Sequence, residues 1–223
     1  PYQVLFWEVY HSLLVSERLI TTETINKKIK KMAVKSKSEL DKLTNEELVS
    51  YLNKLSKTDF NSYVDADTKV RYFIYLYGEG IAKAIKGTDL FFPAITALKI
   101  TESGYGRNTP TGSFNFAGVK YNPNIHSDYV LSDTYEVKNG KRVLVKDTKF
   151  AKFKNAEDGI RQNIQVLLGD RYKNARTQAK SPEEQIKMIA RAGYTTTPAD
   201  QYLSLMSGNI KRVAKKTGFG KIV

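Results

Sequence analysis

The residue best suited to chemistry is Glu102, which ends an apolar stripe on a helix predicted over about residues 90–103. Phe91, Ile95, Leu98 and Glu102 are separated by steps of four, three and four residues, so they share one face of that helix. Apolar neighbours and the negative end of the helix dipole both favour the protonated form of a carboxyl group. A general acid must hold its proton in this way near neutral pH. The alternative is a surface glutamate where a helix simply ends.

The composition narrows the groups that could act with Glu102. The 223 residues contain no cysteine and only two histidines, His11 and His126. Disulfide frameworks, cysteine-ligated metals and cysteine nucleophiles are therefore excluded. Two histidines also argue against a multi-histidine metal site or a Ser-His-Asp triad. We expect carboxylates or tyrosines to carry any acid–base chemistry, with no metal and no cofactor.

The net charge of +13 is concentrated in two segments. Residues 138–180 carry 12 basic and 4 acidic side chains, and residues 205–223 carry 5 and none. Such segments favour an anionic partner, although a solvated lysine surface is the alternative. The segment around Glu102, residues 61–137, carries 7 basic and 8 acidic side chains. This near-neutral balance argues against nucleic acid as the partner.

The first part of the chain has helical patterns. Thr44 and Glu47 are spaced as a capping box before a helix with an apolar face. A second apolar series runs from Val70 to Tyr77 and is predicted to end at Gly78 or Gly80. We interpret residues 1–60 as a helical extension, because they contain no group of reactive side chains, and residues 61–223 as the catalytic domain.

A β-hairpin is predicted around Asn139-Gly140, a sequence typical of a tight type I′ turn. In that register Tyr135 pairs with Leu144 and Glu136 pairs with Val143. Neighbouring side chains on a strand point to opposite faces. If Tyr135 packs inward, Glu136 therefore faces solvent or a cleft.

Two helix starts and one helix end are marked in the last third of the chain. Asn155 can cap one helix, and Ser181 followed by Pro182 can start another. We expect the second helix to end at Gly193, which places Tyr194 directly after it.

Two motifs near Glu102 resemble the catalytic signature of glycoside hydrolase family 73, the N-acetylglucosaminidase domains of bacterial autolysins and of the flagellar rod-cap hydrolase. They are Ile-Thr-Glu-Ser-Gly-Tyr-Gly at 100–106 and Asn-Phe-Ala-Gly-Val-Lys at 115–120. The resemblance extends over about residues 90–204. Phe116-Ala117 stands where the family pattern has Leu-Phe. Ala117 therefore lacks the aromatic ring with which the family residue could contact sugar. The resemblance implies an α+β, mainly α, lysozyme-like fold with a small β-lobe at about 128–153.

The resemblance also implies three catalytic candidates. Glu102 matches the general acid of the family, and the second glutamate of the family lies in the β-lobe, where Glu136 stands 34 residues after Glu102. Tyr194 matches a tyrosine of the active site. Three options stay open for the second role: Glu136 activates water, Glu136 attacks the sugar, or the 2-acetamido group of the substrate attacks while Tyr194 orients it.

Substrate contacts are expected in and near the loop after Glu102, where aromatic faces can stack on sugar rings. The candidates are Tyr105, Phe114, Asn115, Phe116, Tyr121 and Tyr129. We expect only two or three of the five aromatic residues to touch the ligand, since most aromatic residues in a domain of this size are core.

The sequence therefore predicts an endo-β-N-acetylglucosaminidase that cuts the glycan strands of peptidoglycan. The alternatives are a muramidase or lytic transglycosylase of the same fold, and a non-catalytic module that binds the cell wall. Within the family the chain most resembles the membrane-tethered enzymes of Gram-positive cocci. We therefore expect a monomer at the extracellular face of the cell, in the wall, with a membrane anchor preceding this chain. Anionic wall polymers or the membrane surface are expected at the basic segments, and a membrane protein is a further candidate partner.

Overall fold

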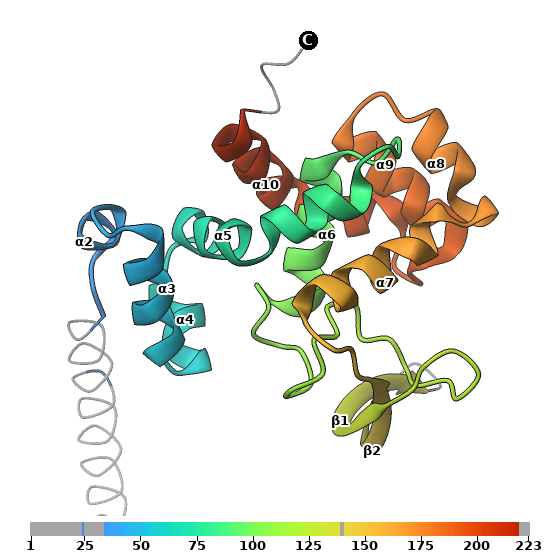
Figure 1. Cartoon of the computed structure of the whole chain (residues 1–223), viewed down its shortest axis with the longest axis horizontal. Helices are drawn as coiled ribbons and strands as arrows, with labels where there is room; N and C mark the ends of the chain where they lie inside the picture. The colour runs from blue at the N-terminus through green and yellow to red at the C-terminus, as the bar shows by residue number, and fades with distance from the viewer. Residues whose placement is uncertain (1–23, 25–33, 139–140, 219–223) are drawn as a thin grey trace, which may run out of the picture. The chain divides into compact units, whose positions relative to one another are not determined.

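The structure is a computed structural model that describes residues 24, 34–138 and 141–218 (Figure 1). The chain forms two compact units, Pro1–Thr68 and Lys69–Val223.

Short capped helices form the described part of the first unit after residue 34: α2 (Lys37–Asp41), α3 (Asn45–Lys54) and α4 (Lys57–Tyr63). Each begins at a hydroxyl side chain that accepts a hydrogen bond from the backbone three residues on. At Thr44, the carboxylate of Glu47 accepts a bond from the backbone N–H of Thr44 in return, which confirms the predicted capping box. The buried side chains of this unit include Leu40, Leu48, Leu52 and Phe60.

Helix α5 (Ala66–Ile85) starts in the first unit and continues into the second. The prediction that this helix ends at Gly78 or Gly80 is wrong. The apolar stripe continues beyond the two glycines with Ile81 and Ile85, both buried, and this packing outweighs the weak helix propensity of glycine.

The second unit is built around α6 (Phe92–Ser103), and every residue from Pro93 to Ile100 is buried. A helix that is buried on all sides lies in the middle of a core, although α6 also buries the polar Thr96 and the basic Lys99. Figure 1 shows α6 among the other long helices of this unit, and its core includes side chains from all of them. The remaining helical elements are α7 (Ala156–Leu168), η1 (Asp170–Tyr172), α8 (Lys173–Thr177), α9 (Pro182–Ile189), the π-helical turn η2 (Ala190–Tyr194) and α10 (Ala199–Thr217).

The predicted ends of these helices agree with the structure at three positions. Gly104 adopts a left-handed conformation with φ 53°, and its N–H bonds to the carbonyl of Ile100, so α6 ends at Ser103, one residue after Glu102. Asn155 and Ser181 cap α7 and α9 with their side-chain oxygens. The prediction that the second of these helices ends at Gly193 is wrong for the α-helix: α9 ends at Ile189, and η2 continues to Tyr194 with a left-handed residue at Gly193.

The antiparallel hairpin consists of β1 (Tyr129–Lys138) and β2 (Lys141–Ala151). The predicted pairs Tyr135 with Leu144 and Glu136 with Val143 are confirmed, whereas the turn Asn139-Gly140 lies outside the described residues. Tyr135 is 56% exposed, so it does not pack inward. Glu136 lies on the opposite face, with 30% of its side chain exposed.

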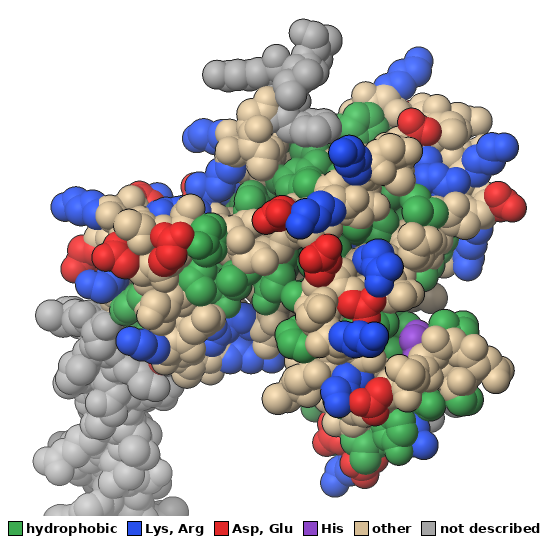
Figure 2. Space-filling model, in the orientation of Figure 1, with side chains coloured by type: hydrophobic (Ala, Val, Ile, Leu, Met, Phe, Trp, Pro, Cys, Tyr) green, Lys and Arg blue, Asp and Glu red, His purple; other side chains and the backbone are tan. Residues whose placement is uncertain are grey.

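The mainly helical architecture with one small sheet confirms the predicted α+β class. Within the described ranges, no helix is both long enough and apolar enough to cross a membrane. Figure 2 shows Lys and Arg side chains spread over the visible face and interspersed with Asp and Glu.

Candidate active site

Glu102 and Tyr194 line one pocket of about 380 Å³ in the second unit. This volume lies within the range of about 300–1,000 Å³ that is usual for small-molecule sites. The pocket walls come from α6, the loop after it, α7, η1 and η2. The other lining residues are Ala117, Val119, Asn163, Val166, Arg171, Tyr172, Gly193 and Thr195.

Glu102 is exposed at this pocket and is held by a tyrosine from α10. The hydroxyl of Tyr202 donates a hydrogen bond of 2.5 Å to Oε1 of Glu102. Tyr202 itself is only 4% exposed, so its ring is fixed by the core. Sequence reasoning missed Tyr202, because the bond joins residues 100 positions apart and no local pattern marks it.

Tyr194 lies half-buried beside two other tyrosines. The centroid of its ring is 6.2 Å from that of Tyr172 and 6.5 Å from that of Tyr202. Burial raises the pKa of the Tyr194 hydroxyl, and the nearby Glu102 raises it further. Burial and Glu102 also raise the pKa of Tyr202. Both hydroxyls therefore remain protonated donors at neutral pH.

Lys99 is a buried cation on α6, one turn before Glu102. Its side chain is fully buried, and its Nζ has no hydrogen-bond partner among the described residues. Burial lowers the pKa of Lys99 to about 8, against the opposing effect of Glu102. Lys99 is thus a buried basic group whose charged form is disfavoured by burial and favoured by the nearby Glu102.

Glu136 lies on β1 and is not among the residues that line the pocket. Its carboxylate forms an ion pair with Nζ of Lys120. The structure therefore brings together two of the three catalytic candidates, Glu102 and Tyr194.

Asn115 and Phe116 are buried, and their side chains interact with other parts of the protein: Asn115 through hydrogen bonds and Phe116 through ring packing. The Asn115 amide nitrogen donates to the carbonyls of Val119 (2.9 Å) and Ala151 (3.0 Å), which fastens the loop to β2. Phe116 is 2% exposed and packs edge-on against Tyr77 with ring centroids 4.8 Å apart. Ala117 and Val119, which follow them in the chain, line the pocket instead.

Tyr105 and Phe114 lie in the loop that follows α6, Tyr105 near its start and Phe114 directly before Asn115. Both residues have a positive φ. The Tyr105 hydroxyl donates to Oδ1 of Asn209 at 3.3 Å. Phe114 is 41% exposed. Neither residue lines the pocket that contains Glu102.

Tyr121 and Tyr129 form an aromatic pair at the base of the hairpin, with ring centroids 5.0 Å apart. Tyr129 is 40% exposed, and the ammonium of Lys149 lies 4.5 Å from the centroid of its ring. This pair is also outside the set of residues that line the pocket.

The second unit thus combines a helical core and a small hairpin with a carboxyl group that a tyrosine holds at the end of the central helix. A family model for glucosaminidase, described as mannosyl-glycoprotein endo-beta-N-acetylglucosaminidase, matches residues 78–215, which is more than half of the chain. The chain belongs to this family, glycoside hydrolase family 73. No curated protein sequence matches the chain significantly.

Solved structures with the same fold confirm the predicted lysozyme-like architecture. A C-terminally truncated glycoside hydrolase domain of FlgJ from Salmonella typhimurium is 23% identical, with a TM-score of 0.53, and covers 64% of this chain and 96% of its own. The catalytic domain of the autolysin Auto from Listeria monocytogenes is 20% identical, with a TM-score of 0.55, and covers 69% and 89%. A peptidoglycan hydrolase mutant from Sphingomonas sp. A1 is 19% identical, with a TM-score of 0.54, and covers 64% and 97%.

Proposed function

We propose that this chain is an endo-β-N-acetylglucosaminidase that hydrolyses the glycan strands of bacterial peptidoglycan, with Glu102 as the general acid. The observation that carries the proposal is the position of Glu102. It projects from the end of a buried helix into a pocket that it shares with Tyr194, and Tyr202 holds one of its oxygens. Family membership supports the bond type, and the neighbouring peptidoglycan hydrolases support the substrate.

The hydrogen bond from Tyr202 to Oε1 assigns separate roles to the two carboxyl oxygens of Glu102. With Oε1 occupied, Oε2 is the oxygen that delivers the proton to the glycosidic oxygen. As the bond to the leaving sugar breaks, positive charge develops at the anomeric carbon. The Tyr202 hydroxyl then stabilises the carboxylate that remains on Glu102.

For the second role we propose that the 2-acetamido group of the substrate attacks the anomeric carbon while Tyr194 orients that group. Tyr194 shares the pocket with Glu102, and its buried hydroxyl stays protonated, so it can donate to an acetamido oxygen. Glu136 is paired with Lys120 outside this pocket, which makes a role of Glu136, as base for water or as nucleophile, the second choice.

The proposed sugar-stacking surface is limited to rings that are exposed or half-buried. Phe114, Tyr121 and Tyr129 remain as candidates for contacts beyond the pocket. Asn115 and Phe116 are excluded from it, because their side chains are buried and bonded or packed within the protein.

The bond that is cut can be tested by digestion of purified peptidoglycan, reduction of the products with borohydride and mass analysis of the reduced sugar. We expect new reducing N-acetylglucosamine ends. Reducing or anhydro N-acetylmuramic acid ends would instead identify a muramidase or a lytic transglycosylase.

The acid can be tested with Glu102→Gln, which removes the proton donor and preserves the shape. General acid catalysis contributes about 10²–10⁴-fold, so we expect kcat to fall by about that factor while folding and glycan binding persist. Glu79→Gln, an exposed carboxylate on α5, is the matched control and should keep full activity. Unchanged activity of Glu102→Gln would overturn the assignment.

The second role can be tested with Tyr194→Phe and Glu136→Gln, together with the anomeric configuration of the first product by NMR. The proposal expects retention of configuration, a large loss of kcat for Tyr194→Phe and a small one for Glu136→Gln. Inverted product with a large loss for Glu136→Gln would assign Glu136 as the base that activates water.

We further propose that the protein acts in the cell wall on the extracellular side, as a monomer that a membrane anchor tethers. The basic segments 138–180 and 205–223 would hold it against anionic polymers or lipid headgroups. Fractionation of the native full-length protein tests this proposal: recovery with membranes supports the anchor, and recovery in the medium contradicts it.

A further inference from the structure

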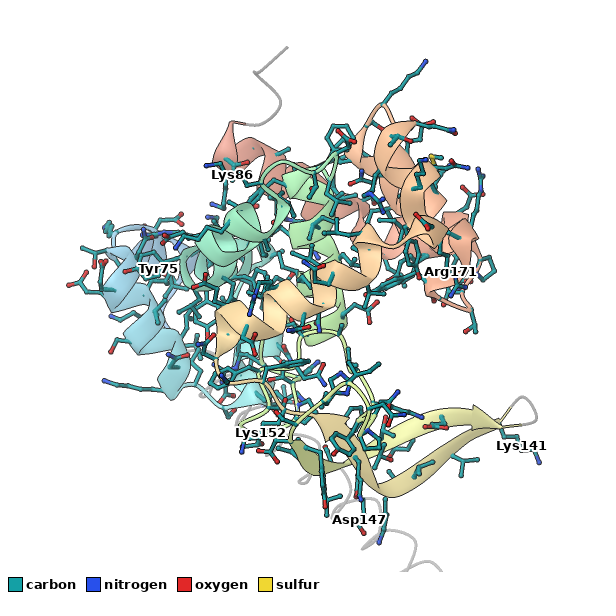
Figure 3. All side chains as sticks on the ribbon, turned by 45° about the vertical axis from the view of Figure 1, so that its right-hand side comes forward. Tyr75, Lys86, Lys141, Asp147, Lys152 and Arg171 are labelled. Carbon is teal, nitrogen blue, oxygen red and sulfur yellow. The ribbon has the colours of Figure 1, made fainter. Side chains whose placement is uncertain are left out.

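Arg171 is a residue of the pocket wall that binds the backbone of the turn carrying Tyr194. It lies in η1, and Figure 3 labels it at the edge of the helices, above the hairpin whose tip carries Lys141. Its Nε donates to the carbonyl of Ala192, and its Nη2 donates to the carbonyl of Gly193 at 3.0 Å. One guanidinium group thus binds the two peptide groups that precede Tyr194.

The η2 turn needs these donors because it is the end of a helix. Carbonyls in the last turn of a helix have no N–H partner further along the same helix. Gly193 has φ 84° and ψ 30°, and the chain continues from Thr195 in an extended conformation. The carbonyls of Ala192 and Gly193 therefore depend on a partner from elsewhere, and Arg171 supplies it from about 20 residues earlier in the chain.

The glycine at position 193 allows the guanidinium to come this close. A Cβ atom at this position would lie 2.0 Å from Nη2 of Arg171, well inside contact distance, and the left-handed φ would be strained for any other residue. The observed position of the Arg171 guanidinium therefore requires a glycine at position 193.

Arg171 also lies beside the first of three aromatic rings that lead to the candidate acid. Its guanidinium lies 5.7 Å from the centroid of the Tyr172 ring. Tyr172 in turn packs against Tyr194, and Tyr194 against Tyr202, which donates to Glu102. Among the described residues, the hydrogen bonds found for the Arg171 side chain are the two to the turn, and no ion pair found there includes it.

We infer that Arg171 is a positioning residue for the reaction: by binding the carbonyls of Ala192 and Gly193 it fixes the hydroxyl of Tyr194 relative to Glu102. The inference rests on the proposed function, because it assigns Tyr194 a role at the substrate. Lysine is a poor substitute for this arginine, since its ammonium is a compact charge without the rigid planar fork that matches two neighbouring carbonyls.

The test compares Arg171→Lys with Arg191→Lys, an exposed arginine within η2 that does not line the pocket. Kinetics on soluble glycan oligomers should show kcat at least tenfold lower for Arg171→Lys, with KM changed less than threefold, and no change for Arg191→Lys. In a Tyr194→Phe background, Arg171→Lys should have no further effect on kcat, because it acts through the missing hydroxyl. Wild-type kcat in Arg171→Lys, or an equal loss in the Tyr194→Phe background, would overturn the inference.

A second measurement does not depend on activity. The protein is labelled with 3-fluorotyrosine, and the ¹⁹F resonance of position 194 is assigned by its absence in Tyr194→Phe. Arg171→Lys should shift or broaden this resonance, and Arg191→Lys should leave it in place. An unmoved resonance in Arg171→Lys overturns the inference whether or not the enzyme cuts glycan. A shifted resonance in a protein that releases no N-acetylglucosamine ends supports the positioning by Arg171 and contradicts the proposed function alone.

Discussion

The Tyr202 hydroxyl lies 2.5 Å from Oε1 of Glu102, a bond that joins the first turns of α10 to the last turn of α6. Tyr202 is a core residue, whereas Glu102 is exposed at the pocket. A rigid donor thus holds a carboxyl group that would otherwise rotate freely at the end of a helix.

Tyr202→Phe should therefore lower kcat without unfolding the protein. A hydrogen bond to a charged group contributes about 1.5–3 kcal/mol, which corresponds to a loss of about 10- to 100-fold. KM should change little, because Tyr202 is buried and does not line the pocket that would hold the substrate. Steady-state kinetics on glycan oligomers measure both quantities. In a Glu102→Gln background the substitution should have little further effect, and an undiminished loss there would show that Tyr202 acts elsewhere.

Lys99→Met should stabilise the protein at neutral pH. Burial holds the pKa of Lys99 at about 8, below its value of about 10.4 in an unfolded chain. Between these values the unfolded chain binds more protons than the folded one, so the contribution of Lys99 to stability rises with pH. Below pH 8 the buried charge imposes its full cost, on the order of 3 kcal/mol.

Urea denaturation of wild type and Lys99→Met at pH 7 and at pH 9.5 measures this effect. We expect the free energy of unfolding of Lys99→Met to exceed that of wild type at pH 7 and the difference to shrink at pH 9.5. A variant that is less stable than wild type at pH 7 would indicate that the ammonium has a favourable partner.

Gly159 and Gly80 are both helical glycines, yet substitution with alanine should have opposite effects. A Cβ at Gly159 would lie 2.0 Å from the carbonyl oxygen of Phe114, so the loop after α6 would have to move. The closest atom to a Cβ at Gly80 is 3.7 Å away, an ordinary contact. We expect Gly159→Ala to cost about 1–3 kcal/mol, as overpacking does, and Gly80→Ala to gain about 0.5–1 kcal/mol.

Thermal and urea unfolding of the two variants test this contrast. Gly159→Ala should also reduce activity, because the displaced loop continues to Ala117 and Val119 in the pocket wall. A Gly159→Ala protein as stable as wild type would contradict the close approach of the loop to α7.

The sequence by itself determined the features that depend on neighbours along the chain. The caps at Thr44, Asn155 and Ser181 were predictable because each uses a side chain within a few residues of the backbone that it bonds. The hairpin register followed from the turn sequence, and the position of Glu102 at a helix end followed from the apolar spacing and Gly104. Local energetics are sufficient for such features.

Only the tertiary structure decided which side chains meet around Glu102. Tyr202 and Arg171 come from elements far from Glu102 and from Gly193 in sequence, so no spacing rule selects them. The same holds for Phe116, whose ring fills the core although its motif suggested the groove. An aromatic side chain suits a core as well as a sugar, and the packing of distant helices decides which of the two it contacts.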